Sequence, residues 1–203
     1  NPPRTSIFKF SRKNNSTYHI HLESPYFSAS IDLNPFFNSL DSSSSLRGFD
    51  NTGNVRLWSG GEALALYFLE NPSSVKDKKV LELGAGFMGL PSLASSKFGR
   101  RMIVTDGNEQ SVSSLGDAIR RNEIANLEAR ILKWGEEELK GEKFDVILAA
   151  DCVFFKNLHL QLLECCNSHL TDDGCVLICS PKRKGSLQVF IETVESAGKW
   201  SYE

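Results

Sequence analysis

The sequence predicts an α/β protein with a doubly wound, mostly parallel, Rossmann-like sheet and a small β meander in front of it. Three observations lead to this prediction. Apolar strand-like runs alternate with amphipathic helical segments from residue 80 onward. The first run, residues 80–83, breaks into a GxGxxG pattern at residues 84–89, where a helix should begin. Two later strand patterns end in acids, Asp106 and Asp151, so polar groups should meet at one edge of the sheet.

The composition of the chain divides it into two regions. Residues 1–47 hold alternating segments between positions 6 and 33, which predict an antiparallel meander, followed by a serine-rich linker at positions 38–45. Residues 48–203 hold the alternating strands and helices and are expected to form one domain. This region ends where a sixth strand would start, so we expect the last strands of such a sheet to be missing.

Each element of the second region has its own signal. Ser59 can cap a helix that Pro72 ends, and Asn157 can cap a later one. Pro91 suits the first turn of the helix after the glycines, and Gly99 suits its end. The predicted order is a helix from 59 to 71, strand 80–83, helix 90–99, strand 101–106, helix 108–125, strand 128–134, strand 144–151, helix 157–170, strand 174–181 and helix 186–197.

The overall composition excludes several function classes. The 203 residues suffice for one domain and a small appendage, and 40% hydrophobic with 24% charged residues is typical of globular domains. A formal net charge of -2 gives no global basic signature for nucleic acid. No apolar run approaches the roughly 20 residues of a membrane helix. We therefore expect a monomer with no nucleic-acid partner and no membrane partner.

The histidines and cysteines predict no metal site. His19 and His21 would share one strand face, but no third ligand is near them in the sequence. The cysteines are odd in number, form no CxxC pair and lie in apolar patterns. We interpret them as reduced core residues of a protein in the cytoplasm, with the nucleus as a second location. They are Cys152, Cys165, Cys166, Cys175 and Cys179.

The glycine turn suits either a dinucleotide or S-adenosylmethionine. Asp106, about 20 residues past the glycines, is placed to bind a ribose diol, although such an acid can also cap the next helix. Glu82 lies two residues before Gly84, where a carboxylate opposes a pyrophosphate but suits the ammonium and sulfonium of S-adenosylmethionine. Trp134, after the third strand, can stack on an adenine or belong to the core. Together these residues favour S-adenosylmethionine over NAD.

From residue 48 to about residue 198 the sequence also resembles the calmodulin-lysine N-methyltransferases, within the seven-β-strand protein lysine methyltransferases. The matching stretches are GFDNTGNV at 48–55 with Trp58, ELGAG at 82–86, TDGNE at 105–109, ADCVFF at 150–155 and PKRKG at 181–185. The first and the last two are more specific than the glycine turn, which many methyltransferases share. The resemblance implies S-adenosylmethionine as cofactor and calmodulin as protein partner.

The turn and the resemblance together define an expected cofactor site. The resemblance implies that Trp58 and Ala150 line the pocket, and its stretches include Ala85, Gly107 and Asn108. The full expected set is Trp58, Glu82, Gly84, Ala85, Gly86, Asp106, Gly107, Asn108, Trp134 and Ala150.

The resemblance also implies where the substrate lysine enters. Asp151 to Phe154 stands for the Asp-x-x-Tyr motif of the family, with phenylalanine in place of tyrosine. We expect Asp151 and Phe154 to be catalytic, with Asp151 positioning the amine. A lysine with a pKa near 10.4 is almost wholly protonated at pH 7, and a channel walled by Phe154 and Phe155 would favour its neutral form.

The basic run Lys182, Arg183 and Lys184 follows the fifth predicted strand, on the same rim as the acids. It could form the cationic edge of a groove for acidic calmodulin, or a solvated loop. Three functions therefore stay open: a calmodulin-lysine methyltransferase, a methyltransferase of another protein, and a non-catalytic module that binds S-adenosylmethionine. The sequence leaves open which lysine is modified and how many methyl groups it receives.

Overall fold

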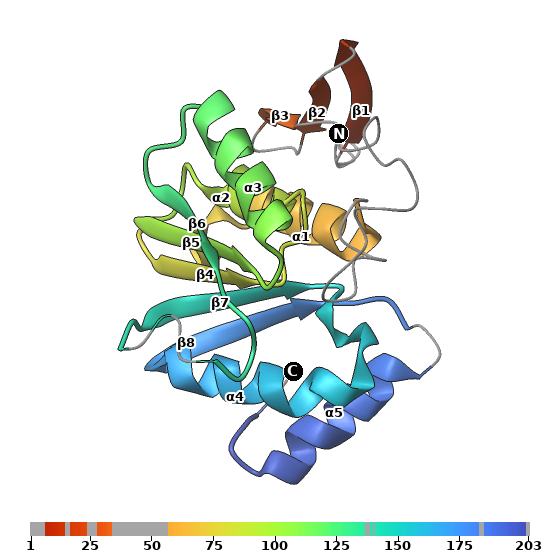
Figure 1. The fold of residues 1–203 in the computed structure, drawn as a ribbon, viewed down its shortest axis with the longest axis vertical. Helices are drawn as coiled ribbons and strands as arrows, with labels where there is room; N and C mark the ends of the chain where they lie inside the picture. The colour runs from red at the N-terminus through yellow and green to blue at the C-terminus, as the bar shows by residue number, and fades with distance from the viewer. Residues whose placement is uncertain are drawn as a thin grey trace, which may run out of the picture.

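The computed structural model describes residues 7–14, 17–23, 28–33, 57–136, 139, 141–182 and 185–201. Within them the chain forms a five-stranded parallel sheet with helices on both faces and a separate three-stranded antiparallel sheet (Figure 1). The predicted α/β class with a doubly wound parallel sheet is therefore confirmed. Among these residues there is no helix with the length and apolar character that a membrane crossing needs.

The parallel sheet has the strand order β6-β5-β4-β7-β8, with the earliest of its strands at the centre. Its strands are β4 (Lys79–Leu83), β5 (Arg101–Asp106), β6 (Leu127–Ile131), β7 (Phe144–Ala150) and β8 (Leu170–Cys179). Each neighbouring pair runs parallel. The chain winds outward from β4 to β6 and then crosses to the other side of β4, so the winding direction switches there. Such a switch point opens a crevice at the carboxyl ends of the strands.

Alternate residues of the central strands face opposite sides of the sheet and build two cores. The paired residues Val80 and Val146 face one core, and their neighbours Leu81 and Ile147 face the other; all four are fully buried. Figure 1 shows the helices divided in the same way, with α1, α2 and α3 on one side and α4 and α5 on the other. Their bounds are α1 (Ser59–Glu70), α2 (Leu90–Ser95), α3 (Glu109–Arg121), α4 (His159–His169) and α5 (Ser186–Ala197).

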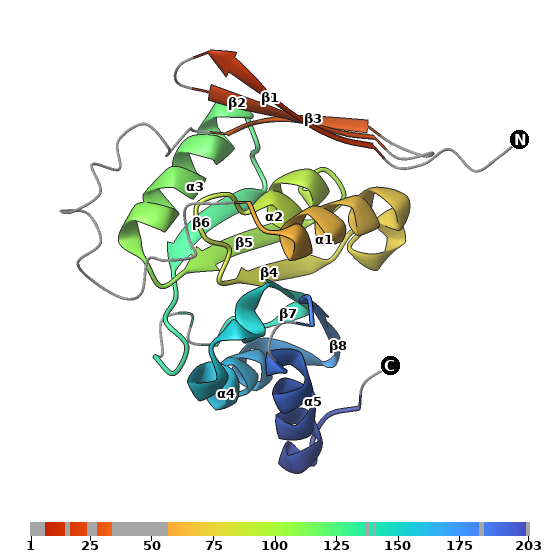
Figure 2. The same ribbon diagram turned by 90° about the vertical axis from the view of Figure 1, so that its right-hand side faces the viewer.

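The predicted meander is present as β1 (Ile7–Asn14), β2 (Thr17–Glu23) and β3 (Ser28–Leu33), paired antiparallel in that order. It lies across α1, α2 and α3, on the side away from the parallel sheet (Figure 2). The serine-rich positions 38–45 and the loop at 48–55 lie outside the described residues. The predicted boundary between residues 47 and 48 therefore stays a prediction.

The helix after the glycines ends earlier than predicted, at Ser95 instead of Gly99. A side chain from the loop before β6 closes the turn that follows it. Asn126 Nδ2 donates to the carbonyl oxygens of Ser96 and Gly99, each at 2.7 Å. The Asn126 side chain thus supplies hydrogen-bond donors to carbonyl groups that would otherwise need a longer helix or a glycine cap. This contact between distant segments is invisible to local helix-end signals.

Two predicted helix caps are wrong. Ser59 is the first residue of α1, and Trp58 holds the cap position. Asn157 lies in a short 3-10 turn, Lys156–Leu158, and α4 starts two residues later. At the start of α4, the buried ring of His159 hydrogen-bonds the carbonyl of Val153, in the preceding 3-10 turn, through Nε2 at 2.9 Å.

The last strand, β8, starts four residues earlier than predicted, at Leu170. It is the outer strand of the described sheet, so the exposed Asp172 and Asp173 fit in it without being buried. The interpretation of all five cysteines as core residues is wrong for the two that lie in β8. Cys175 is exposed and Cys179 half-buried, while the other three are buried; all five are free thiols.

Candidate active site

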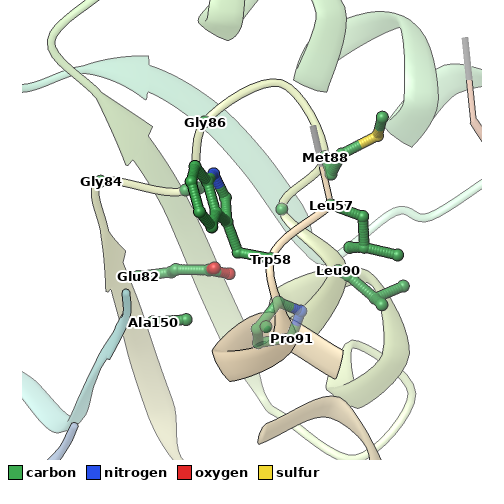
Figure 3. Close-up of a pocket in the computed structure, with 12 residues that line it drawn as sticks. Leu57, Trp58, Glu82, Gly84, Gly86, Met88, Leu90, Pro91 and Ala150 are labelled. Carbon is green, nitrogen blue, oxygen red and sulfur yellow. The ribbon is translucent and has the colours of Figure 1, made fainter. Parts of the chain in front are cut away.

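The carboxyl ends of β4, β5, β7 and β8 meet at one edge of the sheet, at the switch point. A cavity of about 90 Å³ lies there, between the turn after β4 and the start of α1 (Figure 3). The expected cofactor residues that line it are Trp58, Glu82, Gly84, Ala85, Gly86 and Ala150. Leu57, Gly61, Met88, Gly89, Leu90 and Pro91 complete its lining and were not among the expected site residues.

The turn after β4 needs glycine for two reasons. Gly84, Gly86 and Gly89 have φ of 63°, 61° and 49°, in the left-handed region that L side chains rarely adopt. A Cβ on Gly84 would also lie 2.8 Å from Cys152 Sγ and 3.1 Å from Trp134 Cζ2. The turn is therefore packed closely on one side by these two residues and bare on the side that faces the cavity.

Glu82 gives this cavity its electrostatic character. The side chain is 1% exposed, and its Oε2 accepts the Ser92 backbone N–H at 2.9 Å. Burial raises the pKa of Glu82 to about 7, with a smaller contribution from the nearby Asp106 carboxyl, against the lowering effect of the Ser92 hydrogen bonding. A cationic ligand would stabilise its ionised form, so the donor set suits the ammonium and sulfonium of S-adenosylmethionine.

Asp106 lies next to the glycine turn but does not line the cavity. Its Oδ2 accepts the Gly86 N–H at 2.8 Å and its Oδ1 accepts the Asn108 N–H at 2.9 Å. Burial raises the pKa of Asp106, and these backbone hydrogen bonds partly oppose the effect. Asn108 in turn caps α3, because its Oδ1 accepts the N–H groups of Gln110 and Ser111. The acid thus ties the glycine turn to the start of the next helix.

The predicted adenine-stacking residue, Trp134, lies three residues beyond the end of β6 and packs against Gly84. Nearby, Leu132 N–H donates to the Asp106 carbonyl at 3.1 Å, and a Cβ on Gly107 would meet the Lys133 side chain at 3.3 Å. Asp106, Gly107 and Trp134 therefore gather around one part of the site, while Glu82 and Trp58 line the cavity itself. The cavity is smaller than the roughly 300–1,000 Å³ of common ligand pockets, so it fits only part of the cofactor.

Trp58 contributes the wall opposite the sheet. Figure 3 shows its indole beside the turn at Gly84 and Gly86, with the Glu82 carboxylate directed into the same cavity. The first turn of α1 fixes its main chain, since the Glu62 N–H donates to the Trp58 carbonyl at 3.2 Å. Sequence reasoning missed the neighbouring Gly60 and Gly61, although two glycines inside a helical segment signal close packing.

The residues expected to handle the substrate lie beyond the end of β7. Asp151 directly follows the strand, and its Oδ2 accepts the Gly60 N–H at 2.7 Å. Phe154 is 50% exposed, and its ring meets the half-buried Phe155 edge to face at 5.4 Å. Lys182 is exposed, three residues after the end of β8, while Arg183 and Lys184 lie outside the described residues. In the described part of the chain, no three of the histidines, cysteines and acids come together as a metal site would require.

The fold is Rossmann-like and is shared with known methyltransferases. A methyltransferase from Pyrococcus furiosus has the same fold, with a TM-score of 0.56, 23% identity, and coverage of 68% of this chain and 72% of that one. Residues 45–197 match the family model described as lysine methyltransferase, and the chain belongs to that family. This membership confirms the resemblance drawn from the sequence and identifies S-adenosylmethionine as the cofactor. The roles of the individual site residues stay predictions.

Curated relatives share the family but differ in their substrates. A calmodulin-lysine N-methyltransferase of Arabidopsis thaliana is 33% identical over 73% of this chain and 52% of its own length. A protein N-terminal and lysine N-methyltransferase, EFM7, of Candida albicans is 30% identical over 72% of this chain and 64% of its own. A protein-lysine N-methyltransferase, EFM3, of Chaetomium thermophilum is 34% identical over 59% and 39%. The chain spans about half the length of the first curated relatives it matches.

Glu82→Gln should change how stability depends on pH. The folded-state pKa of Glu82 is raised to about 7 from an ordinary 4.5, so its contribution to stability is complete below pH 4.5 and lost as pH rises through about 7. Between pH 5 and pH 8, wild type should therefore lose roughly 2–3 kcal/mol of unfolding free energy relative to the variant. Urea denaturation of the cofactor-free proteins measures this difference. Parallel pH curves for the two proteins would show that Glu82 does not titrate in this range.

Glu82→Gln should also change how the affinity for S-adenosylmethionine depends on pH, and in wild type this affinity should rise with pH while stability falls. If the cation binds the ionised carboxylate, wild type should bind S-adenosylmethionine about tenfold more tightly at pH 8 than at pH 6. Glu82→Gln should bind more weakly at pH 8 and with less pH dependence. Calorimetric titration measures both affinities. Equal affinity of the two proteins at pH 8 would contradict a contact between Glu82 and the cofactor.

Asp106→Ala should raise the dissociation constant for S-adenosylmethionine by about 10- to 100-fold, since a hydrogen bond to a charged group contributes roughly 1.5–3 kcal/mol. Loss of the Gly86 contact would add to the effect. The matched control is Asp172→Ala, an exposed acid near the amino end of β8, which should bind normally. A folded Asp106→Ala protein with wild-type affinity would disprove the ribose assignment.

Proposed function

We propose that this chain is a protein-lysine N-methyltransferase that transfers a methyl group from S-adenosylmethionine to a lysine of calmodulin. The observation that supports lysine as the methylated side chain is the exposed Phe154 beside Phe155. Both follow the strand that ends in the cavity residue Ala150. Aromatic faces attract the ammonium of lysine and of its methylated products.

For methyl transfer, the protein mainly has to align the two reactants and exclude water from the lysine amine. Bound S-adenosylmethionine supplies an electrophilic methyl group on its sulfonium. The lysine amine must be neutral to attack, and the rings of Phe154 and Phe155 would lower its pKa by excluding water. Glu82 and the glycine turn, which line the cavity, would hold the cofactor. Correct alignment of the two reactants can then provide most of the rate.

Calmodulin is supported by the relative from Arabidopsis thaliana and by the motifs after β7 and β8. Because the chain has a formal net charge of -2, attraction of an acidic partner has to be local. The exposed Lys156 follows the aromatic pair, and the exposed Lys182 follows β8. Both lie beyond carboxyl ends of parallel strands, at the edge that holds the cavity.

A second substrate class is favoured by the EFM7 relatives, which are named for protein N-termini as well as lysines. An α-amino group has an ordinary pKa of about 7.7–8.0 and needs much less desolvation than lysine to become neutral. The same aromatic pair could receive either amine.

Incubation with methyl-labelled cofactor and calmodulin tests these alternatives. Peptide mapping should locate the label on a lysine side chain, with heat-denatured protein as the control. A label on the α-amino group would favour the second substrate class. Binding of S-adenosylmethionine without transfer to calmodulin would contradict the calmodulin assignment, and absence of transfer to any protein of a cell extract would indicate a binding module.

Replacing Lys182, Arg183 and Lys184 together by glutamate should raise the KM for calmodulin many-fold. The effect should be largest at low salt, because screening weakens electrostatic steering. The affinity for S-adenosylmethionine should change little. Lys76→Glu, an exposed lysine before the amino end of β4, is the control and should leave the KM unchanged. A triple variant with wild-type KM at low salt would place the calmodulin groove elsewhere.

A further inference from the structure

Three segments that are distant in the sequence meet at one point beside the cavity. They are the residue after β7, the end of β8 and the start of α1. The Gly60 N–H donates to Asp151 Oδ2 at 2.7 Å, across 91 positions of sequence. The Asp151 N–H donates in turn to the Cys179 carbonyl oxygen at 2.8 Å. Asp151 therefore links α1 to two strands of the sheet.

The fit around Gly60 leaves no room for a side chain. A Cβ at this position would overlap Asp151 Oδ2 and lie 2.8 Å from the carbonyl oxygen of Cys179. Gly60 lies in the first turn of α1, and glycine in a helix interior costs about 1 kcal/mol relative to alanine, so its cost here is at most of that order. Glycine lowers the helix propensity at this position, but it allows the Asp151 carboxylate and the backbone of β8 to approach the main chain of α1.

The backbone of Asp151 is held in a sparsely populated conformation. Its φ of 56° and ψ of 21° lie in the left-handed region, which aspartate and asparagine tolerate better than most residues. With its N–H on Cys179 and its carboxylate on Gly60, the orientation of the side chain is defined at both ends. Such a residue is suited to fixing the position of a neighbouring segment.

The segment that it fixes forms a wall of the cofactor cavity. Gly60 is directly followed by the lining residue Gly61, and Trp58 lies two residues before it. The first turn of α1 includes the Trp58 carbonyl, which accepts the Glu62 N–H. Ala150, immediately before Asp151, lines the opposite wall. A shift of α1 away from Asp151 would therefore widen the cavity and move the Trp58 indole.

We propose that Asp151 is a positioning residue. Its carboxylate anchors the start of α1 through Gly60 and so holds Trp58 and Gly61 against the cofactor, and it does not contact the substrate amine. The proposal deepens the function given above and rests on it only for the cofactor. It opposes the catalytic assignment made from the sequence, and the two assignments predict different behaviour of the same variants.

Two replacements of Asp151 separate the carboxylate contact from backbone strain and from charge. Asp151→Gly removes the acceptor but suits the left-handed backbone, and Asp151→Asn keeps an oxygen that can accept the Gly60 N–H. Asp151→Gly should weaken binding of S-adenosylhomocysteine about tenfold or more. Asp151→Asn should bind within about threefold of wild type and keep its turnover number, because the contact and not the charge is needed.

Gly60→Ala tests the same contact from the other side. It should weaken S-adenosylhomocysteine binding although alanine is the better helix former, and its effect should be smaller in the Asp151→Gly background. Gly116→Ala in α3 is the control, since a Cβ there meets its nearest neighbour, Arg120 Nη1, only at 3.4 Å. This variant should leave cofactor binding unchanged. In the cofactor-free proteins, hydrogen exchange of the Gly60, Gly61 and Glu62 amides should accelerate in Asp151→Gly but stay slow in Asp151→Asn.

The opposite pattern would overturn the proposal. If Asp151→Asn binds S-adenosylhomocysteine normally but loses its turnover number by orders of magnitude, the carboxylate acts on the amine. Unchanged exchange of the α1 amides in Asp151→Gly would likewise show that the contact anchors nothing. A wild-type protein that binds the cofactor but methylates no protein would contradict the proposed function alone, because the binding and exchange measurements need no protein substrate.

Discussion

The site depends on a carboxylate that the fold buries without a cationic side chain to pair with it among its hydrogen-bond partners. Glu82 is 1% exposed, and the Ser92 N–H offsets only part of its desolvation, so its pKa rises to about 7. Above about pH 7, where Glu82 is ionised, a neutral side chain of the same shape would stabilise the cofactor-free fold better. A cationic ligand reverses this balance, because its charge favours the ionised carboxylate. We therefore expect this position to favour binding of a cationic ligand at the expense of stability, as is common at functional sites.

The parallel topology brings other polar groups to the edge that holds Glu82. Since β4, β5, β7 and β8 end at the same edge, the residues that follow them come together without any sequence proximity. Because of the strand order, different residues come together on the two sides of β4. The side of β5 and β6 brings Asp106 and Trp134 next to the glycine turn. The side of β7 and β8 brings Asp151 and Cys179 to the start of α1.

What the sequence predicted well was encoded within single strand–turn–helix units. The strand patterns, the glycine turn and Glu82 follow from local spacing, and so the α/β class and part of the cavity lining could be predicted. Trp58 and Ala150 were expected only from the family resemblance. The contacts that failed prediction join segments far apart in the chain. Asn126 closes the turn after α2, and Gly60 meets Asp151 across 91 positions. An asparagine in a loop or a glycine in a helix does not by itself indicate such a contact, because only the packed fold brings the partners together.

The acids at this edge share a feature that their sequence pattern does not reveal. Glu82 accepts from Ser92 in α2, Asp106 accepts from Gly86 and Asn108, and Asp151 accepts from Gly60 in α1. Each carboxylate thus holds the main chain of a segment that borders the site. Backbone N–H groups near turns and helix starts lack partners within their own element, so a strand-end acid can satisfy them while fixing the segment in place. The acids at this edge therefore also build the walls of the site, which explains why an acid at such an edge cannot be assigned to catalysis from its position alone.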